Sequence, residues 1–168
     1  MIDKFGKGIL TLFGIGYFKY APGTAASIVT CAIWLFLYSF KINFLLLTFL
    51  YLIVLLYSII LIDKLTNKFS EVDAKEIVID EFLGMSLPLI TFYSFLAAQE
   101  DWGAQEEFFL YMILPSFVLF RFFDIVKPYP INLIDKKLKN GLGVVLDDLI
   151  AGLFSLLIIF ITLVIIHS

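Results

Sequence analysis

Carboxylate side chains lie side by side at two points where long apolar segments begin. Asp80 and Glu81 are followed directly by an apolar run, and Asp147 and Asp148 interrupt another near the end of the chain. An ionised group at membrane depth is costly unless a cation offsets its desolvation. Carboxylate oxygens are ligands that Mg²⁺ and Ca²⁺ prefer. The two pairs therefore predict a divalent-cation site.

The two pairs differ in how well a purely structural role explains them. Neighbouring helical residues point about 100° apart, so Asp80 and Glu81 share an ion only at a helix start or a bend. The alternative makes Asp80 a helix N-cap and Glu81 a favourable first-turn charge. Capping is a weaker explanation for Asp147 and Asp148, because apolar residues precede them for nearly a full turn.

A third cluster combines basic and acidic groups among phenylalanines. Arg121, Asp124 and Lys127 are spaced i, i+3, i+6, which keeps them on one broad helical face. Pro128 disfavours helix at the preceding residue, so the helix is expected to end near Lys127 and free its side chain. Asp124 adds a possible metal ligand, and the two cations suit a phosphate. The alternative is an internal Arg121–Asp124 ion pair and a lysine that snorkels to lipid head groups.

A glycine-rich segment, residues 14–27, precedes the first long apolar run. Glycine lets a backbone approach a ligand closely, and Thr24 and Ser27 near a helix start offer N–H and hydroxyl donors to an anion. Taken by itself, the segment is better explained as an ordinary loop, with Thr24 as the helix N-cap, than as an anion-binding site.

The elements that position these groups are long and apolar. The chain has 168 residues, 61% of them hydrophobic and 16% charged, and too little interior to bury that surface without a bilayer. A shorter run, residues 25–40, spans the membrane or re-enters it. Four other stretches approach the roughly 20 residues of a spanning helix: Ile42–Ile62, Phe82–Ala98, Phe108–Phe120 continuing toward Val126, and Leu149–Ile166.

These stretches predict an all-α, polytopic membrane protein with about five membrane-embedded helices and short interfacial helices, forming a single domain over residues 1–168. With five spans, eleven of the twelve Lys and Arg residues fall on one side and only Lys41 on the other. Basic residues collect in cytoplasmic loops. The N-terminus and all the charged clusters are therefore expected at the cytoplasmic face of an inner or plasma membrane. The loop after the third span, with Glu100 and Asp101 but no basic residue, is expected outside.

Other residue types exclude some chemistry. Cys31 is the only cysteine and lies in an apolar run, so neither a disulfide framework nor a zinc site is available. The only histidine, His167, is placed at the far terminus, which disfavours thiol or histidine phosphatase chemistry. Oxygen ligands next to phosphate-binding cations instead favour magnesium-assisted phosphoryl transfer.

The four motifs, in this order, resemble the phosphatidylglycerophosphatase A family. The matching segments are Ala-Pro-Gly-Thr within residues 14–27, Ile-Val-Ile-Asp-Glu-Phe-Leu-Gly at 77–84, Phe-Arg-Phe-Phe-Asp-Ile-Val-Lys-Pro-Tyr-Pro-Ile at 120–131 and Asp-Asp-Leu-Ile-Ala-Gly at 147–152. Two positions depart from the family's usual pattern: Ala26 stands where glycine is common, and Ala74 where proline is. Neither departure removes a charged group.

The resemblance implies a Mg²⁺-dependent enzyme that hydrolyses phosphatidylglycerophosphate, a phospholipid in the membrane, to phosphatidylglycerol and phosphate, with no nucleic-acid partner. It implies catalytic roles for Asp80, Glu81, Asp124 and Asp148. The metal ligands would be these four and Asp147, with Asp73 a weaker candidate. Substrate would be bound by Arg121 and Lys127, together with Thr24 and Ser27.

Other classes of membrane protein fit less well. A CDP-alcohol phosphotransferase is expected to carry an Asp-Gly pair, which this chain lacks. In a channel or transporter, ionisable residues are expected on both sides of the membrane or along a path through its midplane. In a structural scaffold, no clustering of acidic residues is expected. A non-catalytic lipid-binding role stays open. The sequence leaves undecided the number of metal ions, the carboxylate that activates water and the oligomeric state.

Overall fold

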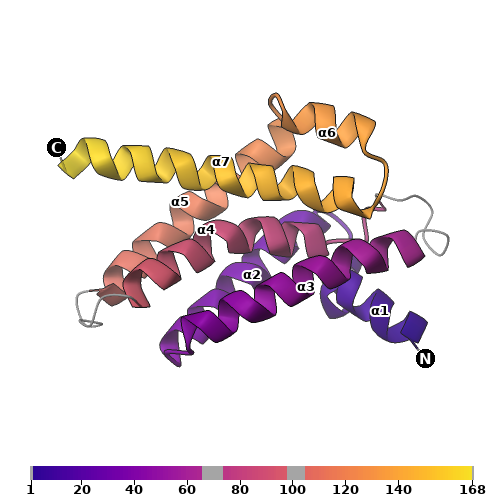
Figure 1. Cartoon of the computed structure of the whole chain (residues 1–168), viewed down its shortest axis with the longest axis horizontal. Coiled ribbons are helices and arrows are strands. Elements are labelled where there is room, and N and C mark those ends of the chain that lie inside the picture. Colours follow the sequence, from indigo (N-terminus) through magenta and orange to yellow (C-terminus); the bar gives the residue numbers. More distant parts are fainter. Residues whose placement is uncertain (1, 66–73, 98–104, 168) are drawn as a thin grey trace.

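The computed structural model describes residues 2–65, 74–97 and 105–167, and every regular element in these ranges is helical (Figure 1). Residues 66–73, with Asp73, and residues 98–104, with Glu100 and Asp101, lie outside the described residues. The helices are α1 (Ile2–Leu10), η1 (Leu12–Tyr17), α2 (Pro22–Ser39), α3 (Phe44–Leu65), α4 (Ile79–Ala97), α5 (Gln105–Val126), α6 (Ile131–Lys137) and α7 (Gly141–His167).

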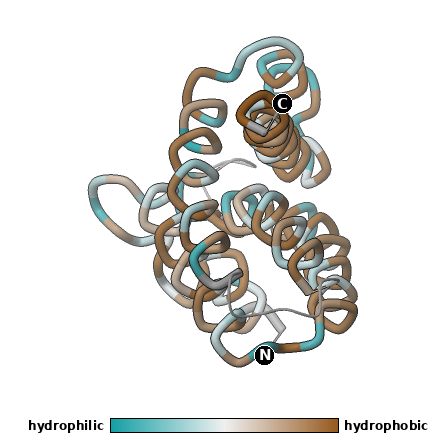
Figure 2. Tube along the Cα trace, turned by 90° about the vertical axis from the view of Figure 1, so that its left-hand side faces the viewer, coloured by the Kyte–Doolittle hydropathy of each residue, from teal (hydrophilic) through white to brown (hydrophobic). Residues whose placement is uncertain are grey.

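Five of these helices, α2, α3, α4, α5 and α7, are long and apolar enough to cross a membrane. The predicted all-α membrane fold is thus confirmed, and the first apolar run is a continuous helix of 18 residues. Figure 2, which looks from the C-terminal end of α7, shows helical turns that are mainly hydrophobic. Many outward side chains are large and apolar, as lipid contact requires: Phe36 is 63% exposed and Ile165 68%.

Helix α4 is the centre of the bundle. In its membrane-length window 67% of the residues are buried, against 22–33% in the other four helices. Polar contacts join α4 to two neighbours: the Trp34 indole of α2 donates to the Ser86 hydroxyl at 2.8 Å, and the Tyr51 hydroxyl of α3 donates to the Leu83 carbonyl at 3.1 Å. Inside an apolar bundle such hydrogen bonds fix helix register. The start of α4 therefore occupies a defined position.

Helices α4 and α7 cross at two glycines. A Cβ atom added to Gly84 would lie 2.5 Å from the Asp148 carbonyl oxygen, and one added to Gly152 would lie 2.2 Å from the Gly84 carbonyl oxygen. Small residues let membrane helices approach this closely. Gly152 thus makes its close contact within the chain, as does Gly143, whose added Cβ would meet the Leu138 carbonyl oxygen at 1.9 Å.

Two helix starts differ from the sequence prediction. Thr24 is not an N-cap: Ala21 occupies that position without a side-chain hydrogen bond, and Pro22 begins α2. Proline suits the first helical position because its fixed φ is already helical and its missing N–H is not needed there. The helix of the last span begins at Gly141, before the apolar stretch that starts at Leu149. The Asn140 side-chain oxygen accepts the Gly143 N–H at 2.9 Å as the N-cap, and the Asp63 carboxylate of α3 accepts the Gly141 N–H at 2.6 Å.

Candidate active site

Three carboxylates from two helices meet at the α4–α7 crossing. Asp80 and Glu81 are in the first turn of α4, and Asp148 is in the second turn of α7. One oxygen from each lies within 4.8 Å of the others. The matched spacing explains the meeting, since Asp80 and Asp148 each stand one turn before a crossing glycine, Gly84 or Gly152. Asp80, Glu81 and Asp148 are called the carboxylate trio below.

Two members of the trio are buried and Glu81 is half-buried, and each of the three has one buried oxygen without a hydrogen-bond partner. Asp80 is 8% exposed and Asp148 3%. Asp80 Oδ1, Glu81 Oε2 and Asp148 Oδ2 are buried atoms without a hydrogen-bond partner. Buried polar atoms normally have partners, and like charges this close repel. The three carboxylates offer oxygen ligands that lie close together and have unpartnered lone pairs. This combination fits a hard divalent cation.

Asp124 lies beside the trio and is paired with a cation. Its Oδ2 atom is 2.6 Å from Arg121 Nη1, one turn earlier in α5, and both side chains are largely buried. The ion pair that the sequence left open as an alternative is thus present. Arg121 Nε has no hydrogen-bond partner, so the guanidinium keeps a donor for another acceptor. Arg121 can therefore bind an anion next to the trio while Asp124 holds the guanidinium in place.

Lys127 links three segments that are distant in sequence. Its ammonium is 2.7 Å from Asp147 Oδ2 of α7 and 3.0 Å from Asp135 Oδ1 of α6. Helix α5 ends at Val126, as Pro128 predicted, and Lys127 takes a left-handed backbone with φ of 44°. That conformation is costly for a residue with a Cβ and is held here by the surrounding contacts.

The charge of Lys127 is secure. Burial lowers its pKa, but the hydrogen bonds and charges of Asp147 and then Asp135 outweigh burial, and the net pKa lies above the ordinary lysine value. Lys127 is therefore a cation throughout the neutral range. Asp147, paired with it, is a neighbour of the carboxylate trio and not a member of the three-oxygen cluster.

A cavity of about 480 Å³ connects these groups. It is lined by all five candidate metal ligands, by Lys127 and by five residues of two adjoining segments, whereas Arg121 reaches it only through its ion pair with Asp124. Among the lining residues that sequence reasoning did not single out are Tyr20, Pro22 and Lys75. Asp135 was missed as well, because its contact with Lys127 depends on how α6 folds back beside α7.

The glycine-rich segment contributes differently from the prediction. The Ser27 hydroxyl donates to the Gly23 carbonyl at 2.9 Å within α2, and among the described residues neither Ser27 nor Thr24 lines the cavity. Gly23 is the close-approach residue: an added Cβ would lie 2.2 Å from Glu81 Oε1 and 3.1 Å from Arg121 Nη1. The start of α2 is therefore packed closely against the Glu81 side chain.

The change Gly23→Ala is expected to lower turnover about 10²-fold while leaving the melting temperature nearly unchanged. The added methyl group meets the end of a flexible side chain, so Glu81 moves and the helices do not, and a shift of about 1 Å at a reacting group costs this much. Activity and thermal unfolding of the purified variant check this. Gly84→Ala is the contrast, because its methyl group meets backbone and should destabilise the fold. A fully active Gly23→Ala protein would contradict the placement.

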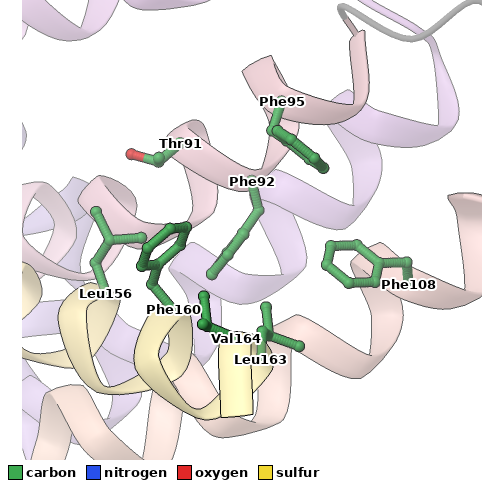
Figure 3. Close-up of a pocket in the computed structure, with 8 residues that line it drawn as sticks. All are labelled: Thr91, Phe92, Phe95, Phe108, Leu156, Phe160, Leu163 and Val164. Carbon is green, nitrogen blue, oxygen red and sulfur yellow. The ribbon is translucent and has the colours of Figure 1, made fainter. Parts of the chain in front are cut away.

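A second cavity, of about 450 Å³, lies at the other end of α4 and α7 (Figure 3). Its walls are phenylalanine and aliphatic side chains, among them Phe92, Phe108 and Phe160. Its one hydroxyl, from Thr91, donates to the Leu87 carbonyl of its own helix at 2.8 Å. The described side chains that line this cavity offer no group for acid–base or metal chemistry, so the charged cavity is the better candidate for a reaction site.

Comparison with known proteins gives one consistent family. The family model described as phosphatidylglycerophosphatase A matches residues 8–163. A Haemophilus influenzae protein named phosphatidylglycerophosphatase A is 36% identical over 88% of this chain and 82% of its own length. The Escherichia coli protein of the same name is 29% identical over 85% of this chain and 74% of its own length.

A third relative carries a different name. A Bacteroides thetaiotaomicron protein, provisionally named phosphatidylinositol-3-phosphatase, is 35% identical over 89% of this chain and 87% of its own length. No solved structure matches the chain. All three names describe enzymes that act on a phosphorylated lipid.

Proposed function

This chain belongs to the phosphatidylglycerophosphatase A family, and we propose that it hydrolyses the terminal phosphomonoester of phosphatidylglycerophosphate, giving phosphatidylglycerol and inorganic phosphate. The observation that carries the proposal for this site is the carboxylate trio, whose buried oxygens lack partners and which shares a cavity with Lys127 and with Asp124, the partner of Arg121. Carboxylates and cations in one cavity suit phosphoryl transfer, which needs positioning and charge stabilisation more than covalent chemistry.

Magnesium is the proposed cofactor, with Asp80, Glu81 and Asp148 as its ligands and Asp124 and Asp147 within the same cavity as further candidates. When bound, Mg²⁺ supplies Lewis-acid stabilisation of phosphoryl oxygens and lowers the pKa of water. The unpartnered oxygens of the trio support this assignment, because a cation would satisfy all three at once.

The chain's own cations and acids have separate proposed roles. Arg121 and Lys127 bind oxygens of the phosphomonoester, as charge-assisted donors that already stand among carboxylates. When the phosphate takes the Arg121 guanidinium, Asp124 is released to accept the proton of the attacking water. The oxygen of that water forms the new P–O bond as the bond from phosphorus to the head-group glycerol oxygen breaks. The proton taken up by Asp124 then passes to that glycerol oxygen, which leaves as the hydroxyl of phosphatidylglycerol.

We propose that the site opens to the cytoplasm from the inner membrane and that the whole chain acts as one catalytic domain. Every described Lys and Arg except Lys41 lies in or next to the helix ends and short helices on the side of the charged cavity. Basic residues concentrate on the cytoplasmic side of membrane proteins. The lipid would then enter from the leaflet at that side.

Phosphate release by the detergent-purified protein tests the function. Release from phosphatidylglycerophosphate is expected in Mg²⁺ and is expected to fall to background in excess EDTA, with recovery when Mg²⁺ is restored. Phosphatidylinositol 3-phosphate, the lipid suggested by the Bacteroides relative's name, serves as the competing substrate. Faster phosphate release from that lipid would reassign the substrate. No phosphate release from either lipid by folded protein would overturn the proposal.

A further inference from the structure

The charged cavity contains a lysine, Lys75, that forms no ion pair with any carboxylate in the described part of the chain. Two cations at the site are paired, Arg121 with Asp124 and Lys127 with Asp147 and Asp135. Lys75 also lines the cavity but is exposed, and it forms no ion pair with a described residue. A cation without a carboxylate partner at the edge of an acidic cavity can bind an anion that comes with the ligand.

The backbone around Lys75 is held in place although its side chain is exposed. The Ile77 N–H donates to the Ala74 carbonyl at 2.8 Å, and the Val78 N–H donates to the Leu10 carbonyl at 2.9 Å. Residue 16 is a glycine packed so closely on this turn that an added Cβ would lie 2.0 Å from the Glu76 carbonyl oxygen. The turn is thus fastened to α1 and η1, and it presents Lys75 at a fixed point of the rim.

A second segment adds to the same rim. Tyr20, 84% exposed, lines the cavity from the segment before α2. The Lys19 ammonium lies 5.7 Å from the centre of the Tyr20 ring, within the range of a cation–π contact. Lys19, Tyr20 and Lys75 form what is called the cationic rim below. It lies outside the carboxylate trio, which is buried at the α4–α7 crossing.

We propose that the cationic rim, through Lys75, binds the phosphodiester of the substrate while Arg121 and Lys127, beside the carboxylate trio, bind the phosphomonoester. This inference rests on the proposed function, in which the substrate carries two phosphates on one head group. The phosphodiester is attached to the glycerol that bears the acyl chains, which stay in the bilayer. It therefore remains nearer the mouth than the terminal phosphate, and the unneutralised cation stands at the mouth.

The two reaction products separate the two proposed subsites. Phosphatidylglycerol keeps the phosphodiester and lacks the monoester, whereas inorganic phosphate resembles only the monoester. Each is therefore a competitive probe of one part of the cavity. Lys75→Ala is expected to raise KM for the lipid and Ki for short-chain phosphatidylglycerol about tenfold, the usual cost of losing a charge-assisted hydrogen bond. Its kcat and the Ki for inorganic phosphate should stay at the wild-type values.

Two further variants complete the experiment. Lys75→Arg should restore tight phosphatidylglycerol inhibition, and Lys136→Ala, an exposed charge on α6 outside the cavity, should change neither Ki. The inference is overturned if Lys75→Ala leaves the phosphatidylglycerol Ki unchanged, if both Ki values rise together, or if Lys136→Ala has the same effect as Lys75→Ala. Wild-type protein that releases no phosphate would instead remove the proposed function itself.

Discussion

Replacing Asp148 by asparagine is expected to reduce phosphate release by at least about 10³-fold, the loss typical of removing a group that stabilises transition-state charge. Asparagine keeps the shape of this buried side chain and removes one of three mutually close carboxylates. The protein should therefore insert and fold. Asp80→Asn is expected to give the same loss, because Asp80 presents an equally buried, unpartnered oxygen to the same point.

Thermal unfolding distinguishes a metal ligand from a merely structural acid. Mg²⁺ should raise the melting temperature of the wild-type protein, because a ligand that binds only the folded state stabilises it. Asp148→Asn should lose that increase, yet melt about 2–4 °C higher than wild type in EDTA, because repulsion inside the trio is relieved. Glu107→Gln is the matched control, because Glu107 is an exposed acid at the end of α5 that is far from Asp124 and the charged cavity. A variant that loses activity but keeps the Mg²⁺-dependent increase would remove Asp148 from the metal site.

Local chemistry explains why the helices could be predicted from the sequence. The lengths of the apolar stretches alone give five candidate spans, because a bilayer of fixed thickness requires an apolar helix of a certain length. The expectation that Asp80 and Glu81 share a site only at a helix start is met, since α4 begins at Ile79. Pro128 ends α5 as its steric effect on Lys127 requires.

Contacts between distant residues could not be predicted in the same way. The link from Lys127 to Asp147 crosses 20 residues and exists only because α6 turns the chain back. The Asp-to-Gly spacing shared by Asp80–Gly84 and Asp148–Gly152 was visible, but its meaning depends on which two helices cross. Sequence reasoning therefore found the acids of the trio, but it did not identify the contact of Gly84 with Gly152 that brings them together.

The rim of the cavity was missed for a related reason. Tyr20 and Lys75 are exposed side chains in short segments, and nothing in their local pattern separates them from ordinary surface residues. They line the cavity because η1 and the turn before α4 pack on each other. Ser27 shows the opposite error. Its hydroxyl was expected to be available to an anion, but it donates to the Gly23 carbonyl of its own helix.

Lys127→Ala is expected to lower kcat/KM about 10²-fold, whereas Lys136→Ala should stay within about twofold of wild type, a difference that follows from their surroundings. Lys127 is half-buried between two carboxylates at the cavity, and Lys136 is exposed on α6. Steady-state kinetics with phosphatidylglycerophosphate measure both. Equal effects would place the phosphate elsewhere.

The loss in Lys127→Ala has two possible physical origins, and a second substitution separates them. Removing the lysine takes away a phosphate-binding cation, and it also leaves Asp147 buried, 5% exposed, without its ammonium partner at 2.7 Å. If neutralising Asp147 were the lysine's whole contribution, Lys127→Ala combined with Asp147→Asn would recover activity. We expect the double variant to remain as impaired as the single one, because asparagine removes the charge that lost its ammonium partner but supplies no cation to the phosphate.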